Sequence, residues 1–102
     1  MAKLLDAATS TVTGSSVPRA SGLTSVFAYG STSSGSGSAT IPVEVSNDGV
    51  YWVVAGTFSL TLATTITTGT NTDGFTINGG WQYIRARVTA ISGTGAAVTV
   101  TV

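Results

Sequence analysis

Small apolar residues alternate with larger or polar ones through the stretch Trp81-Gln-Tyr-Ile-Arg-Ala-Arg-Val-Thr-Ala-Ile91. A period of two is that of a β-strand, whose successive side chains point to opposite faces of a sheet. One face would carry Ile84, Ala86, Val88 and Ala90, and the other would carry Trp81, Tyr83, Arg85, Arg87 and Thr89. The stretch therefore predicts one long strand with a small apolar face and an aromatic, cationic face.

Shorter segments with strand composition lie on both sides of this stretch. They are residues 23–29, 40–46, 57–62, 75–77 and 97–102. Turns are expected at the Gly-containing segments 47–49, 73–74, 78–80 and 92–95, because Asn, Asp and Gly accept positive φ. Several short strands separated by such turns indicate an all-β fold, an antiparallel β-sandwich or jelly-roll-like single domain.

Three segments and one proline are harder to place. Ser31–Ser38 is rich in Ser and Gly and is expected to be a flexible, exposed loop. Val50–Ala55 is apolar on both faces, which is typical of a central strand or of one covered by a partner. The Thr-rich run 63–71 is compatible with continuation of the preceding strand. Pro42 suggests a sheet edge or a bulge, because proline cannot donate to the ladder.

Residues 1–22 are expected to form an N-terminal arm outside the sandwich, which would span residues 23–102. Lys3–Ala8 is compatible with one helical turn, but so short a helix is marginal by itself. We expect removal of residues 1–20 to leave the sandwich folded and to weaken binding to a partner.

The composition excludes several classes of function. The chain of 102 residues has four Lys and Arg, four Asp and Glu, no His and no Cys. Four cations cannot neutralise a run of phosphates or bind an anionic membrane, so neither nucleic acid nor membrane is an expected partner. Without His or Cys there is no imidazole base, thiolate nucleophile or ordinary zinc site. We expect no enzyme, no cofactor and no metal.

The remaining chemical motifs have simpler explanations. Asp48 and Asp73 each precede Gly and are expected in turns, and two separate carboxylates fall short of a calcium site. Ser92 lies beside glycine but has no evident base to activate it. Glu44 is the acid expected on a strand face, where pairing with Arg85 or Arg87 across the sheet is favoured over glycosidase chemistry.

The candidate site is the aromatic and cationic face. Its residues are Trp81, Tyr83, Arg85 and Arg87, joined by Trp52 and Glu44. Aromatic residues and Arg are enriched at protein interfaces, and aromatic rings also bind sugars. Alternatively, Trp81 and Tyr83 fill the second face of the sandwich while the Arg tips reach solvent. Trp52 is expected in the core, with the same interface and sugar-binding alternatives.

Three quoted segments resemble small β-sandwich proteins of tailed-bacteriophage virions. They are Val43-Glu-Val-Ser-Asn-Asp-Gly-Val-Tyr-Trp52, then Trp81-Gln-Tyr-Ile-Arg-Ala-Arg-Val88, and the ending from Ala90. The likeness covers residues 41–102, and such a small stand-alone domain is most similar to head decoration, or cement, proteins. The N-terminal segment and the Ser/Gly loop lie outside it.

This resemblance implies a structural protein made in the host cytoplasm and located in the virion, at the capsid surface. It implies the major capsid protein as a partner and self-association, with a homotrimer favoured. Charged residues make up 8% of the chain, against about 25% in a typical domain, which suits a protein largely covered by other subunits. A tail, baseplate or fibre component and a glycan-binding module remain alternatives.

Overall fold

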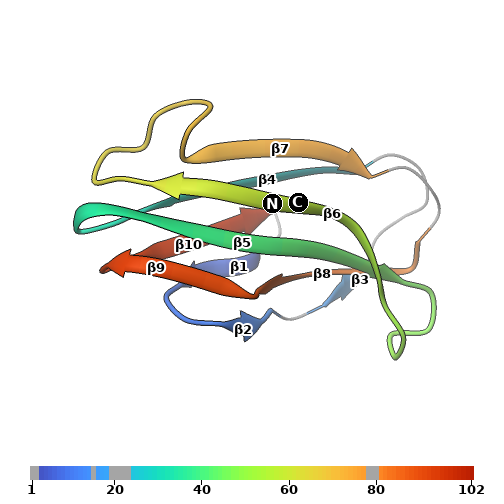
Figure 1. Cartoon of the computed structure of the whole chain (residues 1–102). Coiled ribbons are helices and arrows are strands. Elements are labelled where there is room, and N and C mark those ends of the chain that lie inside the picture. The colour runs from blue at the N-terminus through green and yellow to red at the C-terminus, as the bar shows by residue number, and fades with distance from the viewer. Residues whose placement is uncertain (1–2, 15, 19–23, 78–80) are drawn as a thin grey trace.

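The computed structural model describes residues 3–14, 16–18, 24–77 and 81–102, which form two antiparallel β-sheets packed face to face (Figure 1). The strands are β1 (Lys3–Ala8), β2 (Val12–Thr13), β3 (Val17–Pro18), β4 (Thr24–Ser31), β5 (Ser34–Ser46), β6 (Val53–Leu62), β7 (Thr72–Ile77), β8 (Tyr83–Val88), β9 (Ala90–Thr94) and β10 (Ala97–Thr101). The predicted all-β sandwich is confirmed.

The first sheet has the strand order β1-β10-β4-β7. In the second sheet the order is β2-β8-β5-β6, with β3 also paired to β8 and β9 also paired to β5. Strand β5 is the longest, at 13 residues, and runs through the middle of the second sheet. It pairs with β6 along one edge and with β8 and then β9 along the other (Figure 1).

The core lies between the sheets and follows the predicted alternation. The buried apolar side chains of the second sheet include Ile41, Val43, Val45, Phe58, Leu60, Leu62, Ile84, Ala86 and Val88. The first sheet contributes Val26, Ala28, Ile77, Val98 and Val100. Burying a side chain of this size stabilises a fold by about 1.5–3 kcal/mol, so this layer supplies the main force that holds the two sheets together. No helix in the described part of the chain is long and apolar enough to cross a lipid bilayer.

The stretch 81–91 forms two strands instead of the single long one expected. Strand β8 ends at Val88 and β9 begins at Ala90, with Thr89 between them. The Thr89 backbone N–H donates to the Thr40 carbonyl oxygen at 3.0 Å, so the chain stays attached to β5 through the break. Strand β9 then runs to Thr94, and the expected turn at 92–95 is confined to its end, where Gly95 has a φ of 64°.

The Ser/Gly segment 31–38 is largely exposed, as expected, but it is mostly strand and not a loop. Strand β5 already begins at Ser34, and the Ser33 N–H donates to the Thr94 carbonyl oxygen at 2.9 Å. A Cβ atom at Gly37 would collide with the carbonyl oxygen of Ser92. The glycine therefore permits the close approach of two backbones, and the ladder forms without side chains to pack.

The Thr-rich run after β6 turns back instead of continuing the strand. Its last residue, Asn71, is fully buried and donates from Nδ2 to the Gly30 carbonyl oxygen at 3.1 Å. The Thr67 N–H donates in turn to Asn71 Oδ1 at 3.2 Å. Asp73 and Gly74 lie within β7, so the turn expected there is displaced to residues 67–71. The turn expected at 78–80 lies outside the described residues.

The N-terminal segment differs from the expected arm, because its described residues belong to the two sheets. Lys3–Ala8 is strand β1, not a helical turn, and it pairs with β10. Register shifts along this pairing accompany two consecutive buried side chains, Leu4 and Leu5, which are 2% and 5% exposed. Strands β2 and β3 pair with β8. The apolar Leu pair makes this segment part of the core.

We therefore predict that Leu4→Ala lowers the free energy of unfolding by about 2–5 kcal/mol, since it empties space in a closed core. Denaturant unfolding monitored by Trp fluorescence measures this change. The matched control is Lys3→Ala, whose side chain is 49% exposed and whose loss should change stability by less than about 0.5 kcal/mol. If Leu4→Ala and Lys3→Ala were equally stable, the N-terminal segment would instead behave as an arm outside the core.

Candidate interaction surface

The two faces of β8 are those expected over residues 83–88. Ile84, Ala86 and Val88 point into the core, while Tyr83, Arg85 and Arg87 are partly exposed on the outer face of the second sheet. Trp81 precedes the strand and packs partly buried against the core. The structure therefore brings Arg85 and Arg87 together with Tyr83 on one strand face and gives Trp81 a packing role.

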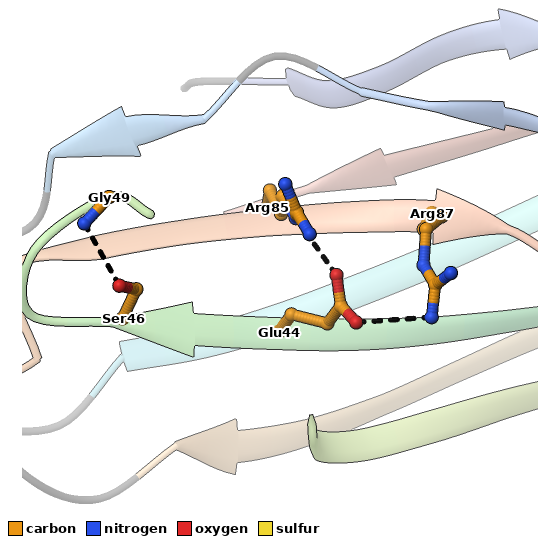
Figure 2. A network of polar contacts seen from close by, with 5 residues as sticks. All are labelled: Glu44, Ser46, Gly49, Arg85 and Arg87. Carbon is orange, nitrogen blue, oxygen red and sulfur yellow. Dashed lines mark hydrogen bonds and ion pairs between the residues drawn. The ribbon is translucent and has the colours of Figure 1, made fainter. Parts of the chain in front are cut away.

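Glu44 lies beside both arginines, as Figure 2 shows. It is opposite Arg85 in the ladder between β5 and β8, and Arg85 Nε donates to Oε1 at 2.8 Å. Arg87 Nη2 donates to Oε2 at 3.1 Å, so each carboxylate oxygen has its own guanidinium. The predicted pairing across the sheet is confirmed for both arginines. The Glu44 side chain is only 8% exposed, and such charge-assisted bonds are what makes its burial tolerable.

Trp52 completes this cluster on the outer face of the sheet instead of filling the core. The Arg85 guanidinium carbon lies 4.1 Å from the centroid of the Trp52 ring, within the range of a cation–π interaction. Arg85 is therefore held by a carboxylate on one side and by a ring on the other. A guanidinium fixed in this way loses little conformational entropy when a further group binds beside it.

The cluster carries an excess of positive charge, because two guanidinium groups share one carboxylate. The Arg87 side chain is 41% exposed and lines a shallow groove of about 490 Å³. The other lining residues are Thr11, Val12, Thr13, Val88 and Thr89. Arg87 Nε is buried and has no hydrogen-bond partner among the described residues. The cationic end of the cluster thus borders a mixed surface to which three threonines and two valines contribute.

A hydrogen-bonded turn follows Glu44 along the chain, at the predicted Asn47–Gly49 position. The Ser46 hydroxyl oxygen accepts the backbone N–H groups of Asp48 and Gly49, at 3.2 and 2.9 Å, and the second bond is drawn in Figure 2. Asp48 Oδ1 accepts the N–H groups of Val50 and Tyr51 at 2.8 and 2.9 Å, and the Ser46 hydroxyl at 2.9 Å. These bonds from Tyr51, Val50 and Ser46 lower the pKa of Asp48 below its ordinary value of 3.8.

The turn and the start of β6 expose an apolar surface that the sequence analysis did not single out as a site. Val50, Tyr51, Val53 and Val54 are 67%, 81%, 52% and 56% exposed. The segment 50–55 is therefore not a central strand, since β6 is an edge strand that begins at Val53. In the sequence, the segment 50–55 stands out because it is apolar on both faces. That pattern is typical either of a central strand or of a strand covered by a partner.

This apolar surface adjoins the charged cluster. Glu44 is opposite Val54 in the ladder between β5 and β6, and Trp52 lies between the exposed residues on either side. A register shift between Val43 and Glu44 leaves Ala55 as an extra residue on β6, one residue further along the ladder from Pro42, which itself pairs regularly with Thr57. Pro42 therefore lies beside a bulge, one of its two expected settings, although β5 is not an edge strand.

The other candidate groups do not assemble into a site. Asp48 lies in the turn and Asp73 in β7, and the described residues contain no group of three or more acidic side chains that could hold a metal ion. Ser92 Oγ lies 3.1 Å from Ser38 Oγ, where the two hydroxyl groups bridge β9 and β5. Comparison of the chain with protein-family models, curated proteins and solved structures found no match.

The paired arginines make a testable prediction about Glu44. Glu44→Gln should lower the free energy of unfolding by about 1–3 kcal/mol, because two guanidinium groups then lose the charge that neutralises them. The range stays below that of a fully buried pair, since both Arg side chains reach solvent. Chemical denaturation provides the measurement, with Asp73→Asn as the exposed acidic control. Equal stability of the two variants would show that the cluster contributes nothing to folding.

The turn makes a second prediction, about pH. The folded-state pKa of Asp48 is lowered, so its contribution to stability is present above its ordinary value of 3.8 and is lost as pH falls through the lowered pKa. We expect the melting temperature of the wild type to fall more steeply below about pH 4 than that of Asp48→Asn, which has no charge to lose. Parallel curves from pH 7 to pH 2 would contradict this role.

Proposed function

We propose that this protein is a structural component of a tailed-phage virion, a capsid decoration protein that binds the outer surface of the assembled head. The observation that carries the proposal is a group of exposed apolar residues that adjoins the cluster of Glu44, Arg85, Arg87 and Trp52, and together they are here called the docking surface. Its residues are Val50, Tyr51, Trp52, Val53, Val54, Glu44, Arg85 and Arg87. The resemblance of residues 41–102 to such virion proteins supports the same function.

The composition of the docking surface is that of a protein interface. Tyr, Trp and Arg are the residues most often found to contribute strongly to binding between proteins. Here Trp52 and Arg85 are already fixed against each other, and Arg85 is fixed again by Glu44. Binding therefore orders few additional side chains, which raises the affinity available from a given contact area.

Head stabilisation would follow from linkage between binding and assembly. A protein that binds the assembled shell and not its separated subunits lowers the free energy of the shell by its binding free energy. The effect is multiplied over all bound copies. The proposed partner is the major capsid protein, and the zero formal net charge of the chain offers little electrostatic resistance to self-association as a trimer.

The sugar-binding alternative receives less support from the aromatic residues. Arg85 occupies one face of the Trp52 ring, and Trp81 packs partly against the core. These two rings are therefore engaged within the protein itself, whereas a sugar platform presents its ring faces to the ligand. A tail or baseplate component would use the same docking surface, and copy number separates it from a head protein.

The test is the copy number in purified virions of the source phage, measured by quantitative mass spectrometry. We expect hundreds of copies, in a fixed ratio to the major shell protein. A handful of copies, or a small multiple of three or six, would move the protein to the tail or baseplate. Absence from the particle would refute the virion proposal and favour a search on glycan arrays.

A further inference from the structure

We propose that the edge of β10 opposite β4 binds strand β1 of a second copy, so that copies of this chain exchange β1 with one another. The inference concerns this chain alone and is independent of the proposed function. Its starting observation is that β1, the outermost strand of the first sheet, combines two buried leucines with an irregular ladder and a strained backbone. The leucines supply the binding surface, and the strain lies where the strand would swing away.

The site for an incoming strand has a defined shape, because β1 of the same chain occupies it in the structure. Leu4 and Leu5 are buried there in the apolar core. A Cβ atom at Gly14 would collide with the Leu4 carbonyl oxygen and crowd the Leu5 side chain, so the pair fits closely between β10 and the segment after β2. A surface that matches one strand this closely matches the same strand of another copy equally well, since the two sequences are identical.

The ladder that holds β1 is irregular. Across the six residues of β1, the pairs are Lys3 with Thr101, Leu5 with Val100 and Ala8 with Val98, with a register shift after each of the first two. The Ala7 N–H donates to a side-chain acceptor, the Thr99 hydroxyl oxygen, at 3.1 Å. On its other edge β10 pairs with β4 at five consecutive positions without a shift. Because such shifts disrupt a ladder locally, main-chain pairing holds β1 less firmly than β4.

The strain lies at Ala7, between the last two of these pairs. Ala7 has a φ of 50° and is the one non-glycine residue with a positive φ in the described part of the chain. An L-residue with this φ brings its Cβ atom too close to a carbonyl oxygen, and an extended chain would relieve that contact. Residues 9–11 then connect β1 of the first sheet to β2 of the second. A short connection next to strain favours strand exchange, because the exchanged form can extend it.

Charge does not oppose the exchange. Lys3 and Asp6 are the charged residues of β1, and their side chains pair with each other at 3.3 Å. An incoming β1 therefore brings no net charge, and the formal net charge of the whole chain is also zero. Exchange replaces each contact within a chain by the same contact between copies, so its extent rises with protein concentration.

The experiment exploits the lack of cysteine in the chain. Lys3→Cys and Thr101→Cys are prepared as separate variants, because these residues are paired across the ladder. They are mixed, unfolded, refolded together at high concentration and treated with oxidised glutathione. We expect a disulfide between position 3 of one copy and position 101 of another, identified by mass spectrometry, and its loss when refolding takes place at high dilution.

The matched control is a mixture of Ser25→Cys and Thr76→Cys. These exposed residues are paired in the ladder between β4 and β7, which does not exchange, so this mixture should give only the disulfide of random collisions. Thr101 is 6% exposed beside β1, and without exchange its thiol variant should give no more. A yield between positions 3 and 101 that does not exceed the control yield at any concentration would refute the exchange.

Two further variants test the strain and the pairing. Adding Ala7→Gly should lower the yield between copies at least about fivefold, because glycine adopts a positive φ freely and the closed chain is then unstrained. Ala8→Gly, at a residue without a positive φ, should not lower it. Equal yields in the two backgrounds would overturn the role of strain. If the double variant Lys3→Cys/Thr101→Cys forms no disulfide, within or between chains, β1 does not occupy the edge of β10 and the inference falls.

Discussion

The central constraint in this molecule is that β5 must pair along both of its edges. One strand of 13 residues forms ladders with β6 on one edge and with β8 and β9 on the other. Every residue of β5 therefore has to suit an interior strand, including its acidic one. Glu44 meets this demand through two arginines on the neighbouring strand, and Gly37 meets it through the absence of a side chain beside β9.

The position of the docking surface follows from the same pairing of β5. Because β5 carries Glu44 between β6 and β8, the arginines that neutralise it gather on one outer face, and Trp52 covers Arg85 there. The register shift opposite Glu44 also separates the regular part of β6 from its apolar beginning. The charged residues, the Trp52 ring and the exposed valines of β6 thus lie close together in the sandwich.

The sequence predicts the core well where side chains alternate between two environments. The inward faces of β5, β6 and β8 are readable because Ile, Val, Leu and Phe recur at every second position. The contact between Glu44 and the arginines is readable too, because strand neighbours of opposite charge favour one another. These features depend on local pattern, which a single chain displays directly.

The remaining features depend on distant backbone and could not be read from local pattern. Leu4 and Leu5 form an apolar pair that suits a helix or a strand equally, and only the exposed edge of β10 decides between them. Residues 34–38 have almost no side-chain signal, yet Ser34 and Ser38 pair with Thr94 and Ser92 of β9. Val50 and Tyr51 are exposed despite the general tendency of apolar residues to be buried, because they lie in the bend that precedes the edge strand β6.

The pairing of β1 with β10 has a consequence for biosynthesis. Strand β1 lies against β10, so this ladder of the first sheet cannot form until residues 97–101 have been translated. Leu4 and Leu5 are therefore translated well before the strand against which they pack. Folds dominated by such distant contacts form slowly, and until β10 is available this apolar pair has no partner strand to pack with.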